Sequence, residues 1–271
     1  MEEMGHNSSM NIVFDIGGTN MRIAVANGET LGEIRKVLTP HDYNETIRQF
    51  AAVARELTPA GIERAAGCIA AQIDSEHGLY DANNRLHWNG YHLDTDLAEA
   101  IGAPVVVGND CAVIGVGEDL RGAGRGSSNM AYVTVSTGVG AAHIKDGAMM
   151  PFDSFFFGHV LVDGAELETL ISGTAIRKKF GIEPKDLDSL DERNKLADIL
   201  ARGLLILHTK WSPDTIVLGG SMIVGVNPIP LERVAAALAQ FMPNPPTIKM
   251  AELGDHGGLI GGAILATRSY Q

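Results

Sequence analysis

The 271-residue chain contains only two cysteines, Cys68 and Cys111, each within an apolar stretch. Two cysteines cannot form a disulfide framework, and reduced core thiols are a simpler interpretation than a disulfide or a pair of metal ligands. No uninterrupted apolar run reaches the roughly 18 residues that a membrane span requires. Residues 1–10 are polar and lack the apolar core of a signal peptide, so the sequence predicts a cytoplasmic protein.

Positive charge is also scarce, because 21 Lys and Arg are outnumbered by 33 Asp and Glu and the formal net charge is −12. Nucleic-acid binding relies on a basic face that neutralises phosphates, so no nucleic-acid partner is expected. An anionic ligand must then be held locally, by backbone amides, a cation or a few basic side chains. The length exceeds that of one small core and favours two domains around a cleft.

The most informative pattern is a strand, a glycine-rich turn and a second strand, which occurs twice. Residues 11–16 run into the turn 17–20 (Gly-Gly-Thr-Asn), and residues 130–135 run into the turn 136–140 (Ser-Thr-Gly-Val-Gly). Glycine leaves backbone N–H groups open to phosphate oxygens, and Ser or Thr hydroxyls add donors. Two such turns facing one another predict a nucleotide site between two lobes.

Hydrophobic periodicity and turn residues predict the remaining elements. Asp94 is expected to cap a short helix that ends near residue 102. The glycine-dense segment 121–128 is the expected boundary between domains 11–120 and 121–271, with the final helix packing back toward the N-terminal lobe. Further strands are expected near 31–38, 65–70, 104–107, 215–218 and 247–253, and helices near 43–57, 94–102, 111–120, 167–180, 193–211, 231–241 and from 258 onward.

In their order and spacing, these motifs resemble those of the ROK sugar kinases, in the superfamily of actin, Hsp70 and hexokinase. The resemblance extends from Ile12 to Ala266. It implies an α/β, two-lobed, ribonuclease H-like fold with a duplicated βββαβα core and an interlobe cleft. It also implies ATP- and Mg²⁺-dependent phosphorylation of a hexose or N-acetylhexosamine hydroxyl. The matching segments are 15–20 and 136–140 (phosphate loops), 109–110 (catalytic pair), 158–159 (sugar loop) and 217–220 (adenosine loop).

Phosphoryl transfer needs an activated alcohol, neutralised phosphate charge and in-line alignment. Asp110, at the end of an expected strand, is assigned as the general base, and Asn109 as a residue that fixes the sugar. A helix N-cap is the alternative role of Asp110, and the positive helix end is expected to keep its carboxylate ionised. Asp15 is expected to orient Mg²⁺ through water, with a tight-turn role as its alternative.

The resemblance also assigns the ligand contacts. Arg22, on the outgoing strand, is expected to be structural. If Glu168 does not contact the sugar, it is expected to be a solvated helix residue. If His159 does not, it is expected to be a buried structural histidine. Gly219 and Gly220 otherwise form a plain strand-to-helix turn. The assigned contacts are Gly17, Gly18, Thr19, Thr137, Gly138 and Gly140 to phosphate, Gly219 and Gly220 to adenosine, and Asn84, Asn109, Asp110, His159 and Glu168 to the sugar.

Three departures from the family pattern put the substrate in question. Phe156, within the run 155–157, stands where the family usually has an acidic residue. The cysteine-rich zinc loop is absent, and His159 alone cannot supply four ligands, so no zinc site is expected. Ala70 and Ala71 replace a Pro-Gly pair, which changes stiffness and allowed backbone angles. The segment 135–140 is similar to that of N-acetylmannosamine kinases.

Two other functions stay open. The phenylalanine run also fits a non-catalytic sensor of sugars or nucleotides, and polyphosphate could replace ATP as the donor. ROK-type repressors resemble this chain plus an N-terminal helix-turn-helix domain, for which the residues before Asn11 leave no room. The edges of the third strands and the apolar segment around Phe155 suggest a homodimer.

Overall fold

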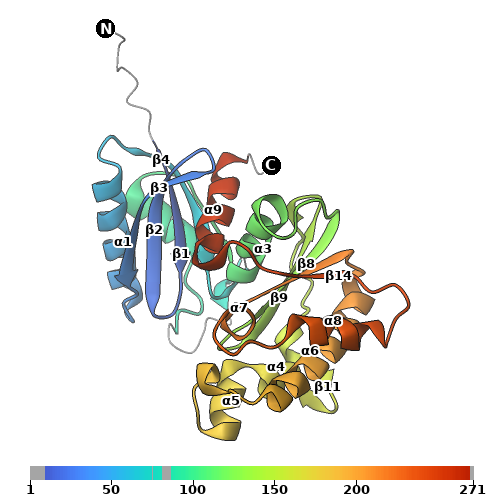
Figure 1. The fold of residues 1–271 in the computed structure, drawn as a ribbon. Coiled ribbons are helices and arrows are strands. Elements are labelled where there is room, and N and C mark those ends of the chain that lie inside the picture. Colours follow the sequence, from blue (N-terminus) through green and yellow to red (C-terminus); the bar gives the residue numbers. More distant parts are fainter. Residues whose placement is uncertain (1–9, 75, 81–86, 269–271) are drawn as a thin grey trace. The chain divides into compact units, whose positions relative to one another are not determined.

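The structure is a computed structural model that describes residues 10–74, 76–80 and 87–268 (Figure 1). The chain forms two compact units. The first consists of Met1–Gly117 with Asp255–Gln271, and the second of Glu118–Gly254. The chain therefore passes between the units twice, at 117/118 inside helix α3 (Asp110–Arg121) and at 254/255. The final helix, α9 (Gly257–Thr267), belongs to the first unit.

The first unit contains a five-stranded sheet in the order β3-β2-β1-β4-β7. Strands β1 to β3 form an antiparallel meander, and β4 and β7 continue the sheet parallel to β1. Asp15 pairs with Cys68, and Ile69 pairs with Asn109, so these residues lie near one edge of the sheet. The bounds are β1 Met10–Ile16, β2 Asn20–Asn27, β3 Thr30–Leu38, β4 Ile62–Ile69 and β7 Val105–Asn109.

Helices α1 (Tyr43–Leu57) and α9 cover opposite faces of this sheet (Figure 1). The side chain of Asp42 accepts the Glu45 N–H at 2.7 Å and caps α1. Phe50 of α1 packs edge-on against Phe14, with ring centroids 5.1 Å apart. Leu259 of α9 is buried with Val13, the neighbour of Phe14 that faces the other way along the strand. Both faces are thus covered, as expected for a sheet with parallel strands.

The N-cap of helix α2 (Leu93–Ile101) is His92, two residues before the predicted cap. The prediction that Asp94 caps this helix is therefore wrong. Asp94 lies in the first turn, where a negative charge still favours the positive end of the helix. Gly102 ends the helix in the left-handed conformation, as expected of a C-terminal glycine. A small hairpin, β5 (Gln72–Asp74) and β6 (Gly78–Tyr80), precedes α2.

Glycines allow α9 to approach β4 closely. A Cβ atom at Gly262 would lie 2.8 Å from the Ala66 carbonyl oxygen. A Cβ atom at Gly258 would lie 2.9 Å from the Cys68 sulfur and 3.1 Å from the Asp15 Cβ. The first turn of α9 therefore packs directly against Asp15, which a side chain at Gly258 would prevent.

The second unit repeats the plan of the first. Its sheet has the order β10-β9-β8-β13-β14, with an antiparallel meander β8 to β10 followed by β13 and β14 parallel to β8. Two meanders, each extended by two parallel strands with helical connections, give the predicted duplicated α/β core. The bounds are β8 Asn129–Val135, β9 Val139–Lys145, β10 Ala148–Met149, β13 Thr215–Gly219 and β14 Thr247–Met250.

The helices of the second unit largely follow the predicted periodicity. One difference is that the single helix expected over 167–180 is broken at Ser172, whose hydroxyl accepts the Ala175 N–H at 3.1 Å. A serine favours such a cap because its side chain competes for backbone groups. The elements are α4 Leu167–Ile171, α5 Gly173–Phe180, α6 Leu190–Trp211, α7 Ser221–Val224, α8 Leu231–Ala239, the 3₁₀ turns η1 Phe157–His159 and η2 Pro184–Asp186, and the hairpin strands β11 Leu161–Val162 and β12 Ala165–Glu166.

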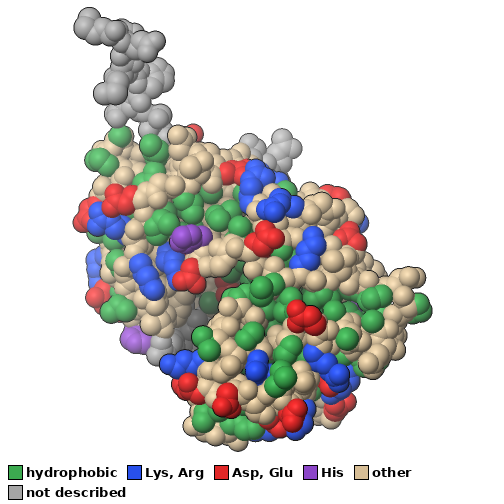
Figure 2. All heavy atoms as spheres, in the orientation of Figure 1, with side chains coloured by type: hydrophobic (Ala, Val, Ile, Leu, Met, Phe, Trp, Pro, Cys, Tyr) green, Lys and Arg blue, Asp and Glu red, His purple; other side chains and the backbone are tan. Residues whose placement is uncertain are grey.

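Charged side chains of both signs are interspersed on the face drawn in Figure 2, which carries no concentrated basic patch. Within the described residues, no helix is both long enough and apolar enough to cross a lipid bilayer.

Candidate functional site

Asp15 lies near the end of β1, and its side chain is 19% exposed. Arg22, directly opposite on β2, donates from Nη1 to Asp15 Oδ2 at 3.3 Å. Cys68, the neighbour on β4, directs its thiol to Asp15 Oδ1 at 3.6 Å. Burial raises the pKa of Asp15, and the Arg22 charge opposes that rise. Asp15 thus has a partner at each oxygen.

Asn109 and Asp110 lie where β7 ends and α3 begins. Asp110 Oδ1 accepts the Cys111 N–H at 2.8 Å and the Asn109 amide at 3.2 Å. Asn109 also donates to the Ala71 carbonyl oxygen at 3.0 Å, which fixes its side chain. Asn109 Oδ1 receives the Ala112 N–H at 3.4 Å, so the two residues share the capping of α3.

Burial raises the pKa of Asp110 to about 6, and the Cys111 N–H opposes this rise while the Asp15 charge adds to it. The carboxyl group is still mostly ionised at pH 7, as expected, although desolvation is the largest influence on its pKa. A pKa close to the working pH is what general base catalysis favours.

Sequence reasoning missed the two thiols as neighbours of these carboxylates. Cys68 and Cys111 are free and buried, as expected, but each also contacts one of the two acids. Burial and the adjacent carboxylates raise the pKa of both thiols, so they stay neutral and can donate hydrogen bonds. The parallel pairing of β1 with β4 places Cys68 opposite Asp15, so a prediction of that register would have indicated the contact.

The first glycine turn is held by Thr39. Its hydroxyl donates to the Gly17 carbonyl oxygen at 2.8 Å, and its N–H donates to the Thr19 carbonyl oxygen at 3.0 Å. Gly17 N–H closes the turn on the Asn20 carbonyl oxygen at 3.0 Å. The motif therefore forms a tight turn, and the side chain of Thr19 is exposed at its tip. Phosphate binding by Gly17, Gly18 and Thr19 stays a prediction.

The second glycine turn is supported by Glu168. The Val139 N–H donates to Glu168 Oε2 at 2.8 Å, and a Cβ atom at Gly138 would lie 2.5 Å from the same oxygen. Glu168 is half-buried, so its alternative as a solvated surface residue is wrong. Thr174 donates its hydroxyl to the Thr137 carbonyl oxygen at 2.8 Å, while the Thr137 side chain is exposed.

The three phenylalanines have three different environments. Phe157 is buried in the core of the second unit, and Phe155 packs edge-on against Trp211 at 5.1 Å. Phe156 stacks on His159, with ring centroids 5.5 Å apart and planes inclined by 19°. His159 is exposed, so the alternative of a buried structural histidine is wrong. Of these three aromatic rings, that of Phe156 is therefore the one that contacts the His159 ring.

Gly219 and Gly220 are required by internal packing. A Cβ atom at Gly219 would lie 2.5 Å from the Tyr132 hydroxyl, and Gly220 has a φ of +86°. The strand-to-helix turn proposed as the alternative is thus present at the start of α7. Ser221 of this helix contacts Ser136 of the second glycine turn through their hydroxyls, 3.1 Å apart. A contact with adenosine stays a prediction.

Asn84 lies outside the described residues. Among those described, no three His, Cys, Asp or Glu side chains are grouped so that they could hold a metal ion. Where the family has its zinc loop, β11 and β12 are joined by Asp163 and Gly164, both with positive φ. The Asp15 carboxylate is a hard oxygen donor of the kind Mg²⁺ prefers, and its existing partners suit a contact through water.

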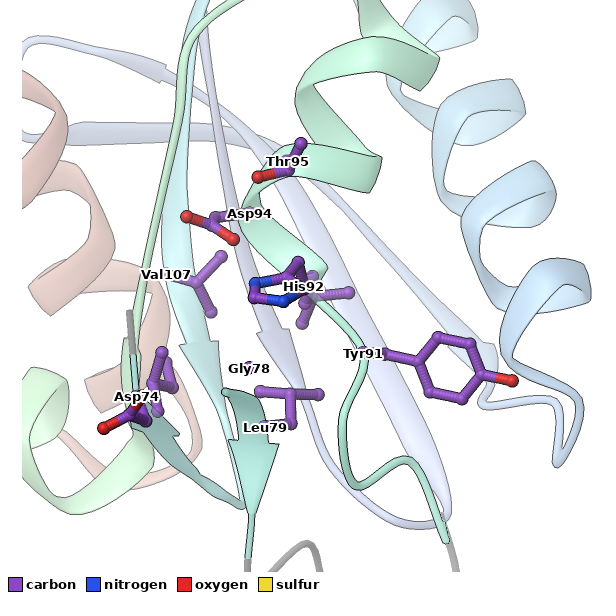
Figure 3. A pocket seen from close by; sticks show the side chains of 10 residues that line it. Asp74, Gly78, Leu79, Tyr91, His92, Asp94, Thr95 and Val107 are labelled. Atoms are coloured by element: carbon purple, nitrogen blue, oxygen red, sulfur yellow. The ribbon is translucent and has the colours of Figure 1, made fainter. Parts of the chain in front are cut away.

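A cavity of about 90 Å³ lies in the first unit, beside the β5–β6 hairpin and the start of α2 (Figure 3). Its walls include Asp74, His92 and Asp94, and none of the predicted site residues within the described part of the chain lines it. Asp74 Oδ1 accepts the N–H groups of Glu76 and His77 at 2.9 and 2.7 Å, so its carboxylate closes the hairpin turn.

The duplicated sheet units form the predicted α/β fold, which is shared by solved structures of a ROK family glucokinase and a ROK hexokinase. The chain belongs to the ROK family, whose sequence profile matches residues 11–269. The predicted resemblance is therefore confirmed at the level of the family.

Three curated relatives span most of this chain. The bifunctional enzyme NanE/NanK of Brucella suis is 30% identical over 100% of this chain and 55% of that protein, so this chain corresponds to about half of it. The N-acetylgalactosamine kinase AgaK of Shewanella sp. is 26% identical over 93% of this chain and 94% of its own length. The polyphosphate glucokinase of Mycobacterium tuberculosis is 25% identical over 92% and 88%. Relatives named as sugar kinases support carbohydrate kinase activity in this chain.

Two solved structures show how widely the fold is used. A ROK family glucokinase from Streptomyces griseus, in complex with glucose and AMPPNP, matches with a TM-score of 0.79 at 22% identity, over 96% of this chain and 100% of that chain. A ROK family transcriptional regulator matches with a TM-score of 0.80 at 17% identity, over 95% of this chain and 77% of that chain. Because the fold serves an enzyme and a regulator, function must be argued from the residues.

Proposed function

We propose that the chain transfers the terminal phosphoryl group of ATP to a hydroxyl of a hexose or N-acetylhexosamine, with Asp110 as the general base. The observation that carries the proposal is the protonation equilibrium and the hydrogen bonding of Asp110, which follows the end of β7. Its pKa is about 6, and the Asn109 amide and the Cys111 N–H both bond to Oδ1. The relatives named as kinases of glucose and N-acetylgalactosamine support this substrate range.

In this mechanism Asp110 acts on the acceptor. Its second carboxylate oxygen, Oδ2, receives the proton of the sugar hydroxyl as the new oxygen–phosphorus bond forms and the bond to the leaving ADP oxygen breaks. Asn109, held by the Ala71 carbonyl oxygen, keeps Asp110 Oδ1 engaged. The carboxylate therefore has one oxygen fixed by the chain and one assigned to the substrate.

On the donor side, the two glycine turns supply backbone and hydroxyl donors to the phosphates. Thr39 and Glu168 hold the backbone of these turns through hydrogen bonds, and the side chains of Thr19 and Thr137 are exposed. Bound Mg²⁺ would neutralise phosphate charge, and Asp15 is the residue that would orient it through water. Cytoplasmic residence and a homodimer remain predictions.

The test is purified protein with ATP, Mg²⁺ and a panel of hexoses and N-acetylhexosamines. Asp110→Asn keeps the size of the side chain but removes the base, so kcat should fall by about 10²–10⁴-fold. Asp94→Asn, an exposed residue of α2, is the matched control and should retain parental activity. A panel without sugar-stimulated turnover, or an Asp110→Asn variant as active as the parent, would refute the proposal.

Two alternatives have specific support. A non-catalytic sensor is favoured by Phe156 beside the exposed His159 and by the similarity to a transcriptional regulator. Calorimetry that detects sugar binding without any phosphorylation would favour it. Polyphosphate as donor is favoured by the similarity to a polyphosphate glucokinase, and a comparison of initial rates with the two donors decides between them.

A further inference from the structure

The guanidinium of Arg22 donates hydrogen bonds to two aspartates of the first unit. Nη1 donates to Asp15 Oδ2 at 3.3 Å, and Nη2 donates to Asp255 Oδ2 at 2.9 Å. Asp15 is largely buried, whereas the side chain of Asp255 is 84% exposed. An exposed ion pair contributes little to stability, so the bond to Asp255 is poorly explained as a stabilising contact alone.

Asp255 occupies a particular place in the chain. It is the first residue of the first unit after the crossing at 254/255. On the other side of the crossing, the Leu253 N–H donates to Glu118 Oε1 at 2.9 Å, and Glu118 is fully buried. Gly254 lies between Leu253 and Asp255 and begins the 3₁₀ turn η3 (Gly254–His256), with a φ of +53° and open space where a Cβ atom would lie. A change of backbone angle at Gly254 therefore moves Asp255 directly.

We propose that Arg22 is a positioning residue that holds the Asp15 carboxylate for phosphoryl transfer and ties it to Asp255 at the chain crossing. The proposal rests on the proposed function, because it assigns Asp15 to the Mg²⁺-nucleotide. Asp255 acts only through Arg22, and Arg22 acts only through Asp15. The backbone conformation at Gly254 is thereby coupled to the orientation of the Asp15 carboxylate.

Arginine suits this role where lysine does not. Its planar guanidinium presents several N–H donors in a fixed geometry and can contact two carboxylates from different nitrogens at once. A lysine keeps the charge but concentrates it on a single nitrogen. Arg22→Lys therefore separates the geometric role of Arg22 from its charge.

The experiment compares the parent with Arg22→Lys, Asp255→Asn and the double variant. For each protein, calorimetry measures the Kd for Mg²⁺-ATP without sugar, and kinetics measure kcat and the KM values for Mg²⁺-ATP and for the sugar. Arg35→Lys is the matched control. Arg35 lies on β3, next to the strand of Arg22, and forms an exposed ion pair with Glu33 of the same strand. Thermal denaturation of every variant monitors the fold.

Arg22→Lys should raise the Kd and KM for Mg²⁺-ATP by about 10-fold, the lower end of the effect of residues that orient a metal-binding group. Asp255→Asn should raise both by about 3-fold, and the double variant should equal Arg22→Lys, since two residues acting in series are not additive. The KM for the sugar and the melting temperature should stay at parental values, as should all constants of Arg35→Lys.

Three results would overturn the proposal: parental Mg²⁺-ATP binding in Arg22→Lys, effects of the two substitutions that multiply in the double variant, or equal changes in both KM values with a lower melting temperature. A parent that binds Mg²⁺-ATP but phosphorylates no sugar would refute the proposed function alone, because the Kd values still test Arg22. A parent that binds no Mg²⁺-ATP would refute both.

Discussion

The chemistry of single residues in this chain depends on burial as much as on identity. An aspartate in water titrates near pH 4, but burial raises the pKa of Asp110 to about 6. The pKa of Asp15 is raised by burial as well and is restrained by Arg22. Burial thus raises the pKa of both carboxyl groups, and a guanidinium opposes the rise at Asp15.

The raised pKa of Asp110 predicts the pH dependence of catalysis. A general base must be deprotonated, so kcat/KM should be constant above about pH 7 and fall about tenfold per pH unit below a midpoint near pH 6. The measurement is kcat/KM for the sugar between about pH 4.5 and 8.5, with folding verified at each pH by circular dichroism. A midpoint near pH 4, the ordinary value for an aspartate, would contradict the assigned environment.

At the scale of elements, Glu118 connects α3 to the end of β14. Its carboxylate is fully buried and accepts the N–H groups of Ala123, Glu252 and Leu253, at 2.9, 3.0 and 2.9 Å. A buried carboxylate is tolerated only when such donors surround it. The contact fixes two segments of the second unit that are far apart in sequence.

Glu118→Ala should destabilise the protein by at least about 3 kcal/mol, because three backbone donors each cost roughly 1–3 kcal/mol when left unpaired. Urea denaturation measures the change. Glu252→Ala removes a nearby exposed glutamate, whose pair with Arg125 spans 3.4 Å, and should cost less than about 1 kcal/mol. Equal losses in the two variants would show that the buried hydrogen bonds are not the cause.

At the scale of the whole molecule, the two units differ in how the chain builds them. The second unit is one continuous segment, Glu118–Gly254, with its own core around Leu200, Leu204 and Ile216. The first unit needs a second segment, because α9 supplies Leu259 and Ala263 to the face of the sheet that carries Val13. Continuity of sequence and of core favours independent folding of the second unit.

A fragment of residues 118–254 should therefore fold alone, whereas residues 1–117 without α9 should not, since one face of their sheet would be uncovered. Circular dichroism with thermal melting of both fragments is the measurement. Adding residues 255–271 to the first fragment through a flexible linker should restore a cooperative transition. A non-cooperative melt of the 118–254 fragment would contradict the division into units.

Local patterns in the sequence were sufficient for most of the elements. Helix α1 has its predicted bounds, 43–57, because an aspartate cap, an apolar stripe and a terminal Thr-Pro all act within a few residues. The cap of α2 and the break at Ser172 were predicted wrongly. In both places several polar residues compete for the backbone, and packing selects among them.

The sequence by itself determined the two glycine turns and most strands and helices, because these follow from short-range backbone chemistry and periodicity, while its resemblance to the ROK family implied the duplicated core and the Asn109–Asp110 pair. Only the tertiary structure decided that Asp110 titrates near 6, that His159 is exposed, and that Arg22 joins Asp15 to Asp255, 233 positions away from Arg22 in the sequence. Burial, charge and hydrogen bonds depend on what distant segments place around a residue, and no local pattern contains that information.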